Sequence, residues 1–152
     1  MPDDWEISVI CGSNKRLAKN LKTKYSSSKR IHIREFILDM GTMMDSADLY
    51  LTKPGGISVS EACTKGLPMV FIDAVAGCEE YNRIHFVRSG GAKTGADTEE
   101  LIKICLSLME DDARRKKMKE SLKKTKQMNS SQIIYEKMKE LTESRHEQNF
   151  TD

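Results

Sequence analysis

A segment of nine residues, K-P-G-G-I-S-V-S-E (53–61), carries residue types that suit a phosphate group. Gly55 and Gly56 lack side chains, so their backbone can approach a ligand closely. They precede an expected helix, whose first N–H groups and dipole favour an anion, and Lys53 adds positive charge. Ser58 and Glu61 also have the spacing of a capping box, which is typical of a plain turn that opens a helix. The residues leave both interpretations open, and the two are compatible because the Ser58 hydroxyl can cap the helix, contact phosphate, or do both.

A second segment, A-G-C-E-E-Y-N (76–82), places two carboxylates and an amide at the start of another expected helix. Carboxylates suit vicinal sugar hydroxyls, because each oxygen can accept a hydrogen bond from one of two neighbouring O–H groups. Acidic residues in a first helical turn also simply suit the helix dipole, and without further context this structural explanation is the stronger one. Cys78 has no histidine beside it in the sequence, so a nucleophilic role is not favoured.

Other common sites are excluded by spacing. Asn14 and Leu17 follow Gly12 where the dinucleotide fingerprint G-x-G-x-x-G needs glycines, and no Walker A sequence occurs. Nicotinamide cofactors and P-loop chemistry are therefore disfavoured. The four cysteines and three histidines are scattered without zinc-site spacing, so we expect no metal site and reduced thiols.

Short apolar runs alternate with helical periodicity along the chain, which predicts an α/β fold with a mostly parallel sheet flanked by helices. Expected strands cover residues 6–11, 31–34, 49–52 and 69–72. Expected helices cover the stripe Leu17, Leu21 and Tyr25, residues 40–47, 58–65 and 79–89, and most of the chain after Asp97, with a break at 129–131. Ligands of open α/β sheets bind beyond the carboxyl ends of the strands. The loops at 12–14, 34–39, 53–58 and 73–80 are therefore expected to line a binding site.

The amino-acid composition limits the classes of protein to which this chain can belong. The chain has 152 residues, of which 38% are hydrophobic and 32% charged, with a net charge of +2. This predicts a folded domain rather than a disordered chain, and so small a charge balance does not argue for nucleic acid. No apolar run is long enough to span a membrane, and no signal peptide is expected. Between Ile7 and Arg34, however, eight basic residues occur without an acid. This pattern fits contact with a polyanion or an anionic membrane leaflet, but a solvated helix face is the commoner explanation.

Five motifs in order carry a resemblance to a known family: I-C-G-S-N (10–14), H-I-R-E-F-I-L-D-M (32–40), A-D-L-Y-L-T-K-P-G-G-I-S-V-S-E-A (47–62), G-L-P-M-V (66–70) and A-G-C-E-E-Y-N (76–82). Over roughly residues 6–110 they resemble the carboxyl-terminal half of GT-B glycosyltransferases. Within this group they look like the monogalactosyldiacylglycerol synthases and the processive diacylglycerol glucosyltransferases. They resemble the peptidoglycan lipid-intermediate N-acetylglucosaminyltransferase more distantly. The block K-P-G-G-x-[ST]-x-S-E followed by G-x-E-x-x-N is specific.

The resemblance implies a Rossmann-like donor domain (residues 1–110) for a uridine-diphosphate sugar, followed by a helical C-terminal extension (residues 111–152). Phe36 and Ile37 would receive the uracil edge through their backbone, and Glu61 would bind the ribose hydroxyls. The diphosphate would lie on residues 55–58, the hexose would face Glu79, Glu80 and Asn82, and residues 12–14 would line the opposite wall. The family commonly has glutamine at the position of Cys78, so the choice of sugar is open. The implied donor-binding residues are Gly12, Ser13, Asn14, Phe36, Ile37, Lys53, Gly55, Gly56, Ile57, Ser58, Glu61, Gly77, Cys78, Glu79, Glu80 and Asn82.

A complete enzyme of this family has a second domain, which would carry the acceptor site, the membrane contact and the general base. We therefore assign no catalytic residue, and we expect this chain alone to be inactive. The expected role is the donor-binding half of a hexosyltransferase acting on a diacylglycerol-type lipid. The alternatives are a non-catalytic nucleotide-sugar-binding subunit of a split transferase, or a UDP-sugar epimerase fragment. No D-x-D motif occurs, and neither a metal nor another cofactor is expected. The expected partners are the UDP-sugar, an N-terminal acceptor domain or separate acceptor subunit, and the anionic inner face of a membrane touched from the cytoplasm.

Overall fold

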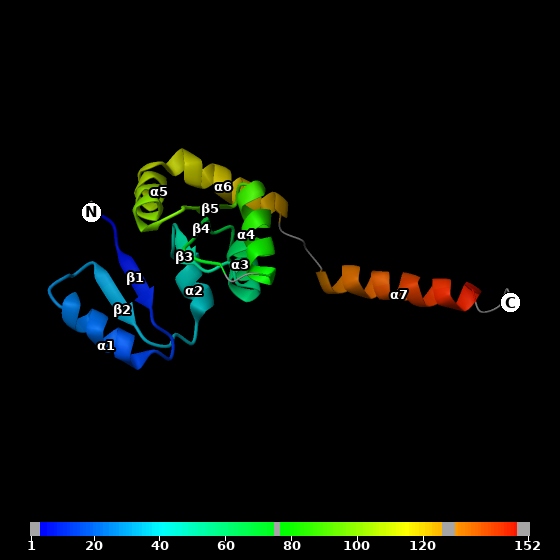
Figure 1. Cartoon of the computed structure of the whole chain (residues 1–152), viewed down its shortest axis with the longest axis horizontal. Coiled ribbons are helices and arrows are strands. Elements are labelled where there is room, and N and C mark those ends of the chain that lie inside the picture. Colours follow the sequence, from blue (N-terminus) through cyan, green and yellow to red (C-terminus); the bar gives the residue numbers. More distant parts are fainter. Residues whose placement is uncertain (1–3, 75–76, 126–129, 149–152) are drawn as a thin grey trace. The chain divides into compact units, whose positions relative to one another are not determined.

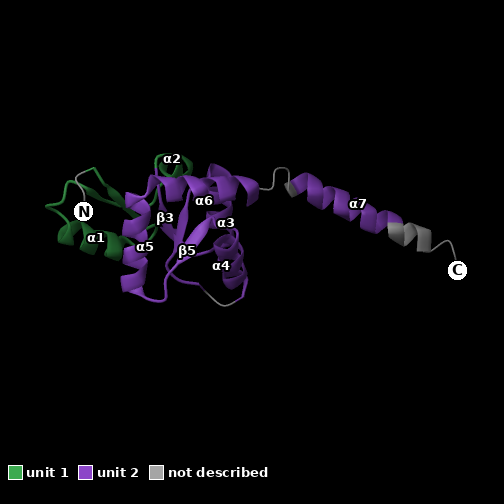
Figure 2. Cartoon of the chain, turned by 90° about the horizontal axis from the view of Figure 1, so that it is seen from above, with its two compact units in different colours: residues 1–46 green, residues 47–152 purple. Residues whose placement is uncertain are grey.

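The computed structural model describes residues 4–74, 77–125 and 130–148, and its elements alternate between strands and helices as far as β5 (Figure 1). The chain forms two compact units, residues 1–46 and 47–152 (Figure 2). The first unit contains β1 (Ile7–Ile10), α1 (Lys15–Lys24), β2 (Ile31–Arg34) and α2 (Met40–Asp45). The second contains β3 (Tyr50–Thr52), α3 (Gly56–Lys65), β4 (Met69–Phe71), α4 (Cys78–Arg88), β5 (Ala92–Thr94), α5 (Thr98–Glu110), α6 (Asp112–Thr125) and α7 (Ser130–Gln148).

The first unit is built on a parallel pair of strands. β1 pairs with β2 from Ile7 opposite Ile31 to Ile10 opposite Arg34. Parallel neighbours need a crossover connection, and α1 provides it. The Asn14 side chain accepts a hydrogen bond from the Leu17 N–H at 3.0 Å and so fixes the start of α1.

The second unit contains a three-stranded parallel sheet in the order β3-β4-β5. The central strand, Met69-Val70-Phe71, is buried along its whole length. A strand covered on both faces is expected to be continuously apolar, which is why this run was recognisable in the sequence. Every strand pair in the described residues is parallel and helices connect the strands, so the predicted α/β class is confirmed. The expected sheet is present as two smaller sheets, one in each unit.

The strand β5 is not predicted by the sequence pattern. Its three residues, Ala92-Lys93-Thr94, form no apolar run, so no local signal marks a strand. Pairing with β4 fixes it instead, with Met69 opposite Ala92 and Phe71 opposite Thr94. The Thr94 hydroxyl also donates to the Phe71 carbonyl at 3.3 Å.

Helices α5 and α6 close the core of the second unit. Val70, Leu108 and Met118 form a buried cluster, and the apolar stripe of α5 packs against it through Leu101, Ile104 and Cys105. Burial raises the pKa of the Cys105 thiol. The next turn of α6 contributes Leu122, which is fully buried and whose carbonyl accepts a long hydrogen bond from the Cys63 thiol of α3. The first part of segment 111–152 therefore belongs to the core of this unit.

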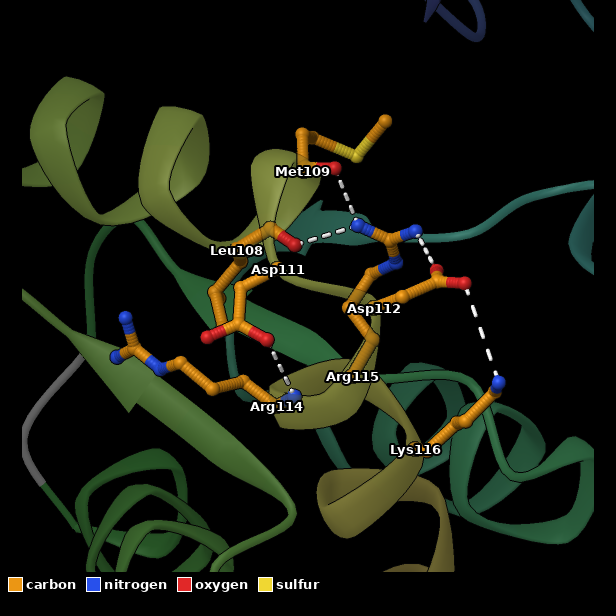
Figure 3. A network of polar contacts seen from close by, with 7 residues as sticks. All are labelled: Leu108, Met109, Asp111, Asp112, Arg114, Arg115 and Lys116. Carbon is orange, nitrogen blue, oxygen red and sulfur yellow. Dashed lines mark hydrogen bonds and ion pairs between the residues drawn. The ribbon is translucent and has the colours of Figure 1, made fainter.

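A polar network fixes the junction between α5 and α6, which the sequence analysis had treated as one helical stretch (Figure 3). The Arg115 guanidinium is 12% exposed, pairs with Asp112, and donates to the carbonyls of Leu108 and Met109 at the end of α5. Asp111 caps the new helix by accepting from the Arg114 N–H at 3.0 Å. One largely buried arginine side chain therefore adds hydrogen bonds to two of the last carbonyls of α5.

Helix α7 has exposed side chains over residues 131–143. Five of them are large apolar residues that are 50–63% exposed, namely Ile133, Ile134, Tyr135, Met138 and Leu141. The predicted break at 129–131 is only partly testable, because residue 129 lies outside the described residues, while Ser130 and Ser131 begin the helix. Across the described parts of the chain, no helix combines the length and the apolar character that crossing a bilayer requires.

Replacing Gly91 by alanine tests the packing of α6 on the sheet. A Cβ at Gly91 would lie 2.3 Å from Cδ2 and 2.9 Å from Cγ of Leu122, which is fully buried and has little room to move. We expect Gly91→Ala to lower the free energy of unfolding in urea by about 1–3 kcal/mol. Gly56→Ala, whose Cβ would meet open space, should change it by less than about 0.5 kcal/mol. Equal effects of the two variants would contradict the packing.

Candidate functional site

The two loops that follow β3 and β4 lie at the same edge of the sheet, because these strands are parallel neighbours. Each loop leads into a helix that is capped by glycine. Gly55 caps α3 with extended backbone, and Gly77 caps α4 at a φ of 97°, a left-handed conformation that favours glycine. The other helices whose N-terminal caps are described, α1, α2, α5 and α6, use side-chain oxygens of Asn14, Asp39, Asp97 and Asp111.

This arrangement corrects the capping-box interpretation of residues 58–61. Helix α3 begins at Gly56, so Ser58 is its third helical residue and makes no cap. The Gly55 carbonyl already accepts from the Val59 N–H at 3.0 Å, which shows that the first helical turn starts two residues earlier than the pattern indicated. A glycine cap has no side-chain acceptor, and no side-chain hydrogen bond caps the start of α3.

A hydrogen bond ties the two loops together. The Asn82 side-chain amide of α4 donates to the Pro54 carbonyl at 2.9 Å, and the Pro54 side chain is fully buried. Figures 1 and 2 show α3 and α4 side by side in the second unit. Asn82 thus holds the glycine loop against α4, whereas the sequence analysis expected it to face a hexose.

The two adjacent carboxylates of α4 have different surroundings. An alanine Cβ placed at Gly55 would lie 3.8 Å from Oε1 of Glu79, so that carboxylate lies beside the glycine loop. Glu80 instead accepts from both Nε and Nη2 of Arg83, with the Nε contact at 2.8 Å. This hydrogen bonding lowers the pKa of the Glu80 carboxyl. Arg83 was not among the predicted site residues, although an acid three residues before an arginine on a helix is a recognisable pairing signal.

Lys53 connects the same two loops by charge. Its Nζ lies 3.4 Å from Oδ2 of Asp73, and both side chains are more than half exposed, at 51% and 63%. The pKa of Asp73 is lowered, first by a hydrogen bond from the Ala74 N–H and then by Lys53. An ion pair this exposed is weak, so an incoming anion can compete for the ammonium group. Asp73 lies in a loop that the sequence analysis had placed at the site, but it was not singled out there.

The outer side of α3 carries Ile57 and Glu61, which are four residues apart and therefore lie on the same side of the helix. Ile57 is 79% exposed and Glu61 is also exposed, while Val59 and Ala62 on the opposite side are buried. The helix thus presents the Glu61 carboxylate to solvent about one and a half turns beyond its glycine cap.

The remaining predicted site residues lie in the first unit. Residues 12–14 follow β1, and Phe36 and Ile37 follow β2, so both loops stand at one edge of the parallel pair. Gly12 adopts a φ of 57°, and the Phe36 side chain is 74% exposed. The Asn14 side chain is engaged as the cap of α1. The predicted residues thus form two groups, one in each unit.

The described residues contain no cluster of three or more histidine, cysteine, aspartate or glutamate side chains with the geometry to hold a metal ion.

Comparison with known proteins gives this geometry a family context. The profile of the family described as glycosyl transferases group 1 matches residues 6–125. The processive diacylglycerol beta-glucosyltransferase of Staphylococcus aureus strain MRSA252 is 30% identical over 136 residues, which are 90% of this chain and 35% of that protein. The protein of the same description from strain Newman is 31% identical over 129 residues, covering 85% of this chain and 33% of its own length. This chain therefore spans about a third of the length of these relatives.

Solved structures show the same fold. The crystal structure of Acinetobacter baumannii MurG aligns with a TM-score of 0.72 at 19% identity, covering 90% of this chain and 42% of MurG. A putative UDP-N-acetylglucosamine 2-epimerase from Listeria monocytogenes aligns with a TM-score of 0.55 at 17% identity, over 78% of this chain and 40% of that one. Together with the family match, these likenesses confirm the predicted Rossmann-like fold and the resemblance to processive diacylglycerol glucosyltransferases.

Replacing Asn82 by alanine tests the link between the loops. The change removes the donor to the Pro54 carbonyl, so we expect the free energy of unfolding to fall by about 0.5–1.5 kcal/mol. Asn20→Ala on α1 is the matched control, because it makes the same substitution at an exposed helical position and should be near neutral. Equal stability of the two variants in urea denaturation would argue against the link.

Proposed function

The chain belongs to the group 1 glycosyl transferases, and on this premise we propose that it binds the UDP-sugar donor of an enzyme that transfers a hexose to a diacylglycerol-type lipid. One observation carries the proposal most directly. Two glycine-capped helix N-termini lie at the ends of neighbouring parallel strands, joined by the bond from Asn82 to Pro54.

The diphosphate of the donor would lie on the N-terminus of α3. Residues 55–58 offer backbone N–H groups and a favourable dipole, and a Cβ at Gly56 would meet no atom within 4 Å, so the backbone there is open to a ligand. Lys53 would leave its exposed pairing with Asp73 to meet the phosphate charge. In this proposal the helix N–H groups and Lys53 neutralise the diphosphate, with neither a metal ion nor a further cofactor.

The other parts of the donor would be recognised by groups on either side of the diphosphate. Glu61, exposed on α3, would accept hydrogen bonds from the ribose hydroxyls. Glu79, beside Gly55, and Glu80, oriented by Arg83, would face the hexose near Gly77 and Cys78. In the first unit, the backbone of Phe36 and Ile37 would receive the uracil edge, and residues 12–14 would also contribute to donor binding. Asn82 is assigned a positioning role in place of the sugar contact.

The activity as a whole requires groups that we do not assign to this chain. The lipid acceptor site and the general base would come from an acceptor domain or a separate acceptor subunit. We place the reaction in the cytoplasm at the inner face of an anionic membrane. The four free cysteines support a reducing compartment.

A non-catalytic subunit of a split transferase or an epimerase fragment would bind the same nucleotide. The epimerase alternative has the structural likeness noted above in its favour, but that likeness extends only to the fold. With the acceptor-binding part supplied, transfer of labelled hexose to diacylglycerol supports the transferase, while interconversion of sugar epimers supports the alternative.

Calorimetric titration with UDP, with ADP as the control nucleotide, tests the donor site directly. We expect selective UDP binding that Glu61→Ala weakens by about 10- to 150-fold, since charge-assisted bonds to the ribose contribute roughly 1.5–3 kcal/mol. Glu110→Ala, which removes an exposed glutamate at the end of α5, should leave the affinity unchanged. Equal affinity for UDP and ADP would refute uridine recognition, and an unchanged Glu61→Ala would refute the assigned ribose contact.

A further inference from the structure

The carboxylate of Asp73 lies in the candidate site but has no part in the proposed binding of the donor. Glu61, Glu79 and Glu80 would each meet hydroxyl groups of the ligand, and Lys53 would meet the diphosphate. Asp73 instead lies in the loop after β4, with Oδ2 at 3.4 Å from Nζ of Lys53. A carboxylate beside the cation that serves a phosphate group works against the binding of that phosphate.

Backbone contacts bring Lys53 and Asp73 to this position. The pairing of β3 with β4 continues past the end of the strands, because the Ile72 N–H donates to the Thr52 carbonyl at 3.1 Å. Lys53 and Asp73 directly follow these two residues. On the other side of Lys53, the Pro54 side chain is fully buried. The ion pair therefore forms between backbone positions that are already fixed, and only side chains have to move when it opens.

The two carboxylate oxygens of Asp73 have different partners. Oδ1 accepts from the Ala74 N–H at 2.8 Å, whereas Oδ2 faces the ammonium group of Lys53. The hydrogen bond from Ala74, and after it Lys53, lowers the pKa of the Asp73 carboxyl, which is therefore ionised at neutral pH. One oxygen thus orients the carboxylate within its own loop, and the other is presented to Lys53 from the neighbouring loop.

We propose that Asp73 is a positioning residue that acts through Lys53: its carboxylate competes with the diphosphate for the ammonium group and so weakens the binding of both the donor and the product UDP. The inference rests on the proposed function, because it requires that Lys53 meets the diphosphate. When UDP leaves, Asp73 takes the ammonium group back. Competition of this kind favours release of the nucleotide after transfer.

The expected size of the effect follows from the exposure of the pair. Ion pairs between side chains as exposed as these close with an equilibrium constant of about 1.4 to 5. Lys53 is then available to a ligand for only a fraction of the time, and the apparent Kd rises by the inverse of that fraction, about 2- to 6-fold. The factor is the same for every ligand that needs Lys53, because it depends on the pair and not on the ligand.

The variant Asp73→Asn tests the competition, because asparagine keeps a side-chain oxygen for the Ala74 N–H and removes the charge. In calorimetric titration of the full chain at low ionic strength, we expect UDP and inorganic pyrophosphate both to bind about 2- to 6-fold more tightly. The matched control is Glu120→Gln on α6, which removes the same charge from another exposed pair, with Lys123, and should leave both affinities unchanged.

Repeating the substitution in a Lys53→Met background identifies the group through which Asp73 acts. The gain from Asp73→Asn should then largely disappear, since no ammonium group is left to release. Equal gains in the two backgrounds would show that Asp73 repels the phosphate directly, and this result would refute competition for Lys53. A purely structural role of Asp73 predicts the opposite sign, because a disturbed loop would bind both ligands more weakly.

Unchanged or weaker binding by Asp73→Asn, or an equal gain in Glu120→Gln, would overturn the proposal. The two ligands separate this inference from the proposed function. If Asp73→Asn tightens pyrophosphate binding while UDP binds no better than ADP, competition for Lys53 stands and uridine recognition fails. If UDP binds selectively and Asp73→Asn has no effect, the donor site stands and the role of Asp73 is refuted. Failure of the chain to bind either ligand would refute both.

Discussion

The parallel pairing of β3 with β4 is the constraint on which the candidate site depends. Because both strands run in the same direction, the glycine loop after β3 and the loop after β4 end at one edge of the sheet. The bond from Asn82 to the Pro54 carbonyl then fixes the distance between them. β4 can sit at the centre because its three residues are all apolar and buried, with Val70 packed against Leu108 of α5 and Met118 of α6. Core packing and site geometry are thus set by the same strand.

The glycine caps of α3 and α4 stabilise these helices less than a side-chain cap would, but they leave the first backbone N–H groups accessible to a ligand. Asparagine or aspartate caps hold the starts of α1, α2, α5 and α6, and such a cap is typically worth about 1 kcal/mol relative to a residue without a side-chain acceptor. Glycine at the same position loses part of that contribution but leaves the first N–H groups without a side chain in front of them. An anionic ligand can then act as the missing cap. Binding and local helix stability are coupled in such a design.

Local patterns predicted the elements that carry their own signal, and tertiary contacts determined the rest. The buried run of β4 and the apolar stripe of α5 were visible because burial imposes a hydrophobic pattern. The strand β5 was not, since A-K-T becomes a strand only through its ladder to β4. Site residues were predictable by type and loop, but their partners were not. The pairing of Lys53 with Asp73 and the donation from Asn82 to Pro54 join residues 20 and 28 positions apart. No local spacing rule encodes such contacts.

The arrangement of the charged residues along the chain also carries information that the net charge does not. A net charge of +2 conceals a stretch from Ile7 to Arg34 whose charged residues are all basic, and ion pairs on α6 and α7 such as Arg115–Asp112 and Lys137–Glu140. The physical consequence differs, because the fields of paired opposite charges largely cancel, whereas the fields of charges of one sign add within a Debye length of about 8 Å. The place of each basic residue relative to the nearest acid, and not the balance over the chain, therefore determines which surface can attract an anionic partner.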